Sequence, residues 1–221
     1  MFSLIVYLED IGYTVRIQVE NKNGMQLLKG LFFIHKKAIE EARIWPEAIT
    51  IDATYKTNAH KLSLVNIVGT SNVTSVRSNT LQTFSVAAAF VNSETEESYT
   101  WILRELREAV WNDGHGLPNV FVTDNEKALR NAIDTIFPES QHLLCSWHLW
   151  NTMVTKLPIG SVTSEEYNLR RCQAENAFKA IMSSTNEDQY KIAIRDFEQV
   201  VTSPGSFKKN GQTALLYLKD M

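Results

Sequence analysis

Two acidic residues stand at the ends of apolar segments, and their positions suit metal-dependent chemistry. Asp52 follows the apolar run 48–51, and Asp124 follows the run 119–123. In an open α/β sheet, ligands collect at the carboxyl ends of the strands. Two carboxylates a few ångströms apart repel each other unless a cation lies between them, and Mg²⁺ prefers carboxylate oxygens. The pair therefore predicts a two-metal site that binds Mg²⁺ or Mn²⁺ and supports in-line displacement at phosphorus.

Each acid also has a purely structural interpretation. Either Asp124 or Thr123 could cap a following helix, because T-D-N-E at 123–126 has the form of a capping box. Asp52 could begin a turn before Thr54. An aspartyl-phosphate phosphatase would place a second Asp two residues after the first, and Thr54 occupies that position instead. The coincidence of two acids at two strand ends favours a site.

A C-x-x-H pair formed by Cys145 and His148 follows the last predicted strand. Such a pair is half of a zinc site, and His142 and Cys172 could supply two further ligands. The spacing is unspecific, so we expect no structural zinc. The alternatives are a buried cysteine at a strand-to-helix corner, or His148 reaching the scissile phosphate or a metal-bound water.

The elements that position the acids follow the order β-β-β-α-β-α-β-α. Three strands are predicted at 48–52, 62–76 and 83–91, and a helix capped by Ser93 follows them. Consecutive strands can form an antiparallel meander, while later strands return through helices and add in parallel. The rest of the order comprises a strand at 119–124, a helix at 129–137, a strand at 141–145 and a helix from Ser146. This is the α/β order of the RNase H-like, retroviral-integrase-like fold.

The remaining chain divides into flanking segments. Residues 1–46 are predicted to form an N-terminal β/α segment, with β-type runs within 2–24 and a short helix at 35–44. Residues 47–158 are predicted to form the RNase H-like core, and residues 159–221 are predicted to form a partial helical insertion.

The charge of the chain is acidic overall but unevenly distributed. The net charge is −3 and the pI is about 6.0, which argues against a dedicated DNA-binding module. The stretch 53–93 nevertheless contains no Asp or Glu, while it contains Lys56, Lys61 and Arg77. These three cations are candidate contacts to a DNA backbone beside Asp52, although the distribution could also be accidental.

Targeting and redox features of the sequence favour an intracellular protein. No apolar run reaches the roughly 18–20 residues of a membrane span, and the N-terminus lacks the basic flank of a signal peptide. Two cysteines provide no disulfide framework and fit a reducing compartment.

Three ordered motifs resemble the Mutator-like element (MULE) transposase family. The run D-A-T-Y-K-T-N at 52–58 is similar to the first-acid motif of the family, and V-T-D-N-E-K-A-L at 122–129 is similar to its second-acid motif. C-S-W-H at 145–148 resembles its C-x-W-H motif. The resemblance covers roughly residues 25–157. It implies an RNase H-like core of the DDE type that cuts and joins DNA with divalent metal, with Asp52 and Asp124 as the first two catalytic acids.

The resemblance also implies features that this sequence does not display. A DDE site needs a third carboxylate, and none of the glutamates after residue 160 stands in a recognisable third-acid context. We therefore expect a truncated copy that is inactive alone, with the third Glu beyond Met221. The family implies DNA as the partner (transposon ends and target), a nuclear location and a homo-oligomer of the full-length protein. The alternative is a catalytically inactive, transposase-derived, DNA-associated or transcription-regulatory protein.

Overall fold

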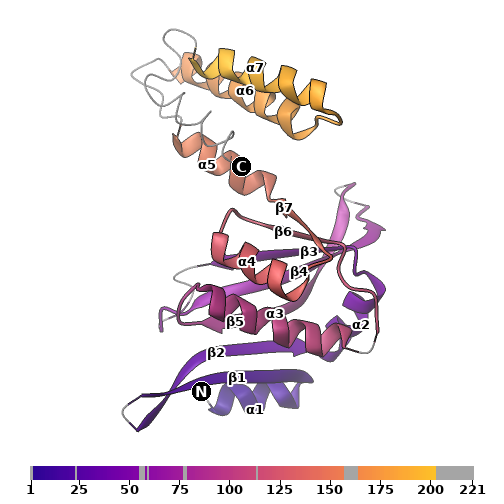
Figure 1. Ribbon diagram of the computed structural model, residues 1–221, viewed down its shortest axis with the longest axis vertical. Coiled ribbons are helices and arrows are strands. Elements are labelled where there is room, and N and C mark those ends of the chain that lie inside the picture. Colours follow the sequence, from indigo (N-terminus) through magenta and orange to yellow (C-terminus); the bar gives the residue numbers. More distant parts are fainter. Residues whose placement is uncertain are drawn as a thin grey trace. The chain divides into compact units, whose positions relative to one another are not determined.

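The chain forms two compact units, residues 1–144 and residues 145–221. The computed structural model describes residues 2–22, 24–54, 58, 60–76, 79–112, 114–156 and 164–202. The strands of the described residues belong to the first unit, and the helices α5, α6 and α7 belong to the second (Figure 1).

The first unit is built on one mixed sheet of seven strands in the order β1-β2-β5-β4-β3-β6-β7. The neighbouring pairs β1-β2, β2-β5, β5-β4 and β4-β3 are antiparallel, whereas β3-β6 and β6-β7 are parallel. The strands span Tyr13–Lys22 (β1), Met25–His35 (β2), Ala48–Thr54 (β3), Ser63–Thr74 (β4), Leu81–Val91 (β5), Val120–Thr123 (β6) and Gln141–Leu144 (β7). The part β5-β4-β3-β6-β7 has the strand order and directions of the RNase H-like fold, so the predicted fold class is confirmed.

Among the described residues, four helices belong to the first unit. They span Phe2–Asp10 (α1), Lys36–Ile44 (α2), Glu96–Trp111 (α3) and Lys127–Ile136 (α4). The apolar face predicted for α3 is buried, including Ile102 and Leu106, and that of α4 is buried at Leu129 and Ile133. These side chains pack on sheet residues such as Phe121 in one core cluster. The core therefore lies between the sheet and the helices α2, α3 and α4.

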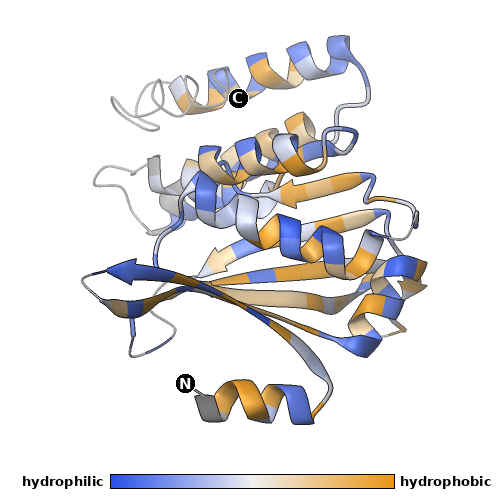
Figure 2. Cartoon of the chain, turned by 60° about the horizontal axis from the view of Figure 1, so that its bottom comes forward, coloured by the Kyte–Doolittle hydropathy of each residue, from blue (hydrophilic) through white to orange (hydrophobic). Residues whose placement is uncertain are grey.

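The N-terminal segment differs from the prediction. Residues 2–10 form the helix α1, whereas the sequence predicted a β-type start. The prediction was wrong here because a short apolar run does not distinguish a buried strand from a helix. Gly12 has a φ of 93° and its amide donates to the carbonyl of Glu9, which ends the helix. The strands β1 and β2 then add to the edge of the main sheet beside β5. In Figure 2, α1 lies beside this hairpin, apart from α3 and α4.

Two local boundaries also differ. The N-cap of α3 is Thr95, whose side chain accepts a hydrogen bond from the amide of Ser98, so Ser93 is not the cap. β3 continues past Asp52 to Thr54, so the first acid lies near the end of its strand and not at its last position. The helix predicted at 35–44 is confirmed as α2, with His35 as its N-cap.

The second unit contains Ser146–Lys156 (α5), Ser164–Met182 (α6) and Glu187–Thr202 (α7). α6 and α7 pack on each other, and the buried side chains there include Phe178, Ile181 and Phe197. This confirms helical structure after the fifth core strand for the described residues. None of the described helices combines the length and the apolar character that crossing a membrane requires.

Candidate metal-binding acid pair

The register of two neighbouring parallel strands brings the two predicted acids together. β3 and β6 pair with Ala48 opposite Val120 and Thr50 opposite Val122. Asp52 and Asp124 each lie two residues after the last of these pairs. Because positions alternate between the faces of a sheet, this register gives Asp52 and Asp124, the residue directly after β6, equivalent positions with respect to the sheet. Adjacent strands are about 4.8 Å apart, so this register brings Asp52 and Asp124 next to each other at the carboxyl ends of β3 and β6.

Asp52 is held within a strand that is paired on both sides. It is half-buried, and the Thr54 hydroxyl donates to its Oδ2 at 3.4 Å. On the other side of β3, Asp52 lies opposite Asn66 of β4. In the structure, Asp52 lies within the strand β3 and not in a turn, so the interpretation of Asp52 as a turn residue is wrong.

Asp124 lies one residue past β6, in the turn that leads into α4. Its Oδ1 accepts a hydrogen bond from the amide of Glu126 at 3.3 Å. The N-cap of α4 is Glu126, whose side chain accepts from the amide of Ala128 at 3.2 Å. Neither Asp124 nor Thr123 is therefore the helix cap, and the capping interpretation of the second acid is wrong.

Thr123 contacts both the main chain of Asp124 and the side chain of His142. The Thr123 side chain is buried, and its Oγ1 lies 2.6 Å from the carbonyl oxygen of Asp124 and 2.7 Å from His142 Nε2. Burial lowers the pKa of His142 below its ordinary value, and the charge of Arg130 lowers it further. His142 thus contacts the second acid's turn.

The sequence analysis did not identify Glu94 and Tyr99, which lie near the strand ends that carry the acid pair. Glu94 lies three residues after the end of β5. The strands β3 and β5 end at the same level of the sheet, because Leu64 of β4 pairs with both Thr54 and Phe90. The hydroxyl of the buried Tyr99 donates to the Glu94 carboxylate. The pKa of Tyr99 is raised, first by burial and then by the charges of Glu94 and Asp124. The strand-end rule that selected Asp52 and Asp124 would also have selected Glu94.

The C-x-x-H residues lie at the start of the second unit. Cys145 is a half-buried free thiol whose carbonyl accepts from the amide of Leu149 at 3.0 Å, so it precedes the first turn of α5. His148 is half-buried, and its ring lies 4.8 Å from the ring of Trp147 in an edge-on arrangement. Throughout the described residues, no three or more His, Cys, Asp or Glu side chains are grouped so that they could hold a metal ion.

The three cations predicted to contact DNA are only partly covered by the structure. Lys61 is exposed in the β3–β4 connection, where its φ is 57° and its amide donates to the carbonyl of Asn58. Lys56 and Arg77 lie outside the described residues. The DNA contacts of all three cations stay predictions.

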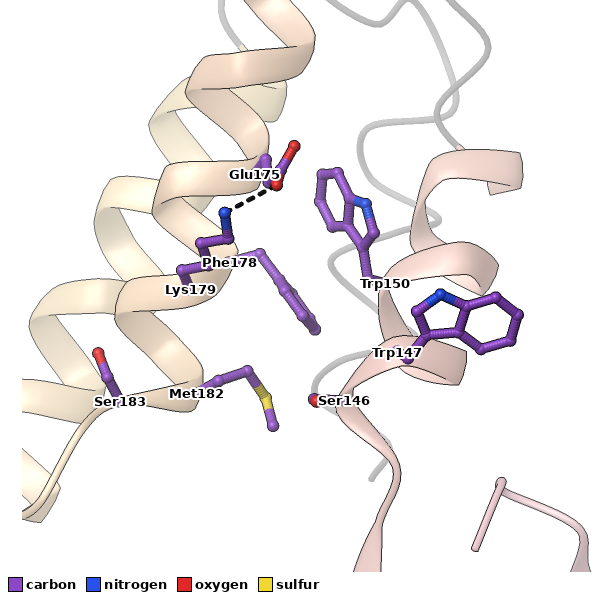
Figure 3. Close-up of a pocket in the computed structure, with 8 residues that line it drawn as sticks. All are labelled: Ser146, Trp147, Trp150, Glu175, Phe178, Lys179, Met182 and Ser183. Atoms are coloured by element: carbon purple, nitrogen blue, oxygen red, sulfur yellow. Dashed lines mark ion pairs between the residues drawn. The ribbon is translucent and has the colours of Figure 1, made fainter. Parts of the chain in front are cut away.

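A cavity of about 470 Å³ lies between α5 and α6 (Figure 3). The rings of Trp150 from α5 and Phe178 from α6 both line it and lie next to each other, with centroids 5.5 Å apart. At its rim, Lys179 Nζ and Glu175 Oε1 form an ion pair at 2.8 Å. The lining is mainly apolar and holds one carboxylate that is already paired with a cation, so the cavity does not resemble the acid pair of the sheet edge.

The acid pair lies within a segment that is similar to a known family. Residues 48–152 match the family described as the MULE transposase domain, a span that contains Asp52, Asp124, Cys145 and His148. Among curated proteins, the chain is 23% identical over 188 residues to Protein FAR1-RELATED SEQUENCE 4 of Arabidopsis thaliana, covering 81% of this chain and 24% of that protein. It is 26% identical over 147 residues to Protein FAR-RED IMPAIRED RESPONSE 1 of the same organism, covering 63% of this chain and 17% of that protein. The chain thus spans a quarter or less of the length of these relatives.

One solved structure is also similar, at a low level. The Mos1 transposase catalytic domain, solved with raltegravir and Mn, matches with 13% identity and a TM-score of 0.31 over 82% of this chain and 91% of that one. A TM-score this low supports no conclusion about the site, so the fold assignment stands on the strand order and directions themselves.

Proposed function

We propose that this chain, which carries a MULE transposase domain over residues 48–152, supplies the first two acids of a DDE-type site that acts on DNA phosphodiester bonds. The observation that carries the proposal is the register of β3 and β6, which sets Asp52 and Asp124 side by side. The chain is transposase-derived, and hydrolysis and strand transfer are the activities proposed for its site.

The donor set fits a hard divalent cation. Two carboxylates at the ends of neighbouring strands offer oxygen ligands, which suit Mg²⁺ or Mn²⁺ better than zinc. Asp52 and Asp124 would hold the ion. When bound, it would activate an attacking hydroxyl and stabilise the charge of an in-line displacement.

The chain's own contribution is rigid placement of the two carboxylates. Asp52 belongs to a strand that is paired on both sides, and the side chain of Asp124 is anchored by the amide of Glu126. Sites on regular elements hold their geometry more closely than sites on loops. This placement would fix the phosphate and the attacking oxygen relative to each other.

Among the described residues, no third acid, Glu94 included, groups with Asp52 and Asp124 so that the three could hold a metal ion. Among the described residues of α6 and α7, Glu175 pairs with Lys179 and Glu187 pairs with Lys191, each one helical turn away. Pairs of this kind are ordinary helix-surface contacts. We propose that the third acid comes from outside the described residues and that the chain alone has negligible cleavage activity.

Affinity cleavage with Fe²⁺ tests where a metal binds. Fe²⁺ can replace Mg²⁺ at oxygen sites and, with ascorbate and peroxide, cuts the nearby backbone. We expect cuts next to Asp52 and Asp124, suppressed by excess Mn²⁺ and lost in Asp52→Asn and Asp124→Asn. Asp188→Asn is the matched control, since Asp188 is an exposed acid of α7. Cuts that persist in both site variants would show that the metal binds elsewhere.

A second candidate function is regulatory and non-catalytic. Similarity to FAR1-RELATED SEQUENCE 4, over 81% of the chain, and to FAR-RED IMPAIRED RESPONSE 1 supports it, since neither protein is named a transposase. Nicking of supercoiled plasmid DNA in Mn²⁺ distinguishes the two, when measured on the full-length protein that contains this chain. Nicking abolished by Asp52→Asn and Asp124→Asn supports the enzyme, whereas DNA binding without nicking supports the regulator. DNA as partner, a nuclear location and homo-oligomerisation are part of both proposals.

A further inference from the structure

Two consecutive hydrogen bonds connect His142 of β7, through Thr123, to the main chain of Asp124. His142 on β7 lies 2.7 Å from Thr123 Oγ1 through its Nε2, and Thr123 Oγ1 lies 2.6 Å from the carbonyl oxygen of Asp124. The parallel pairing of β6 and β7, with Phe121 opposite His142, sets this contact. The main chain of Asp124 is therefore tied to the neighbouring strand through two side chains.

The direction of these hydrogen bonds follows from the available hydrogens. A carbonyl oxygen can only accept, so the single hydroxyl hydrogen of Thr123 points at Asp124. The oxygen of Thr123 must then accept from His142, which requires the hydrogen of a neutral imidazole to be on Nε2. The network thus assigns the tautomer of His142.

Burial makes the network difficult to replace with water. Thr123 is 1% exposed. Removing its hydroxyl would leave the His142 ring N–H and the Asp124 carbonyl without this partner, which is unfavourable wherever water cannot replace it. A polar group of this kind at a buried position holds its neighbours in one arrangement.

The same turn also fixes the carboxylate itself. The amide of Glu126 donates to Asp124 Oδ1 at 3.3 Å, and Glu126 in turn caps α4. The carbonyl of Asp124 is therefore held by Thr123, which is itself bonded to His142 of β7, and its side chain is held by the amide of Glu126. Outer-shell hydrogen bonds of this type orient metal ligands in proteins, and their loss typically costs about 10–100-fold in metal affinity.

We propose that His142 and Thr123 are positioning residues for Asp124. They hold the turn after β6 so that the Asp124 carboxylate keeps the orientation that a divalent cation needs. This inference rests on the proposed function, because it assumes that Asp124 is a metal ligand. Both residues would act through Asp124, by way of the contacts of Thr123 with His142 and with the Asp124 carbonyl.

The test compares Mn²⁺ affinity, measured by calorimetry, across variants of the whole chain. Thr123→Val removes the hydroxyl at nearly constant volume and is expected to weaken Mn²⁺ binding about 10–100-fold. Thr123→Ser keeps the hydroxyl and should bind within about threefold of the parent protein on the same reasoning. Thr135→Val is the matched control, since Thr135 is an exposed threonine of α4 whose hydroxyl donates to the carbonyl of Asn131.

The histidine is tested in the same way. His142→Phe removes the donor and should weaken Mn²⁺ binding, whereas His142→Gln restores a donor and should recover most of the affinity. This pair carries the test if Thr123→Val does not fold. Nitrogen NMR shifts of the His142 ring give a readout independent of metal, and they should report the Nε2–H tautomer.

Two results would overturn the inference. If Asp124→Asn loses Mn²⁺ while Thr123→Val and His142→Phe bind it like the parent protein, the network does not position the acid and the proposed function still stands. If Asp124→Asn itself binds Mn²⁺ normally, the proposed function fails and the inference fails with it. The Nδ1–H tautomer at His142 would contradict the hydrogen-bond directions.

Discussion

The packing of α3 on β2 gives a sharp stability prediction at Gly30. A Cβ atom at this position would lie 2.4 Å from Cζ3 of Trp101 and 3.0 Å from two further ring atoms. Trp101 is 9% exposed, and Gly30 is paired with both β1 and β5, so neither partner can move easily. Overpacking a core costs about 1–3 kcal/mol, and a clash of this depth belongs near the upper end.

The net effect of Gly30→Ala includes one opposing contribution. Alanine is favoured over glycine within a strand by roughly 0.5–1 kcal/mol, so we expect a net loss of about 2 kcal/mol. Urea denaturation followed by tryptophan fluorescence measures it. Gly116→Ala is the control, because a Cβ there meets no atom within 4 Å, and its stability should change by less than about 0.5 kcal/mol.

A double-mutant cycle tests the cause of this loss. Trp101→Phe makes the neighbouring ring smaller, so Gly30→Ala should cost markedly less in that background than in the parent protein. If Gly30→Ala alone is as stable as the parent protein, the close approach of α3 to the hairpin is not as described. Equal costs in both backgrounds would show that the loss does not come from Trp101.

Two further predictions concern the elements that flank the acid pair. Thr95→Ala removes the N-cap of α3 and should cost about 1 kcal/mol in urea denaturation, whereas Thr95→Ser should not; equal stability of both variants would contradict the cap. Because the pKa of His142 is lowered in the folded protein from 6.5, the unfolded chain binds this proton more readily. Its contribution to stability is therefore present above about pH 6.5 and lost as the pH falls through the folded pKa, by at most about 1.4 kcal/mol per pH unit. Denaturation between pH 5 and 7.5 should show a shallower decline for His142→Gln, and an unchanged decline would refute this origin.

The core elements were predictable because their signals are local. The apolar face of α3, with residues such as Ile102 and Leu106, follows helical spacing, and the run before Asp124 is continuously apolar as buried parallel strands tend to be. Both acids stand at or near the ends of strands, and the apolar runs that precede them are enough to mark them as candidates. Local patterning therefore predicted the RNase H-like order, and it marked the two acids, whose metal-binding role stays a prediction.

Other features depend on contacts that sequence patterns do not specify. The apolar run Phe2–Asp10 fits a buried strand or a helix equally, and the partner of the β1–β2 hairpin is set by long-range pairing with β5. The contact between Glu94 and Tyr99 joins the end of β5 to the first turn of α3, and that of His142 with Thr123 joins two strands.

Direct Mn²⁺ titration by calorimetry tests whether Asp52 and Asp124 together bind a divalent cation. Each of Asp52→Asn and Asp124→Asn removes one charged ligand and should weaken Mn²⁺ binding by at least about tenfold, since even outer-shell losses have effects of that size. Asp188→Asn should bind Mn²⁺ like the parent protein. Equal Mn²⁺ affinity in the parent protein, Asp52→Asn and Asp124→Asn would contradict the assignment of the acid pair.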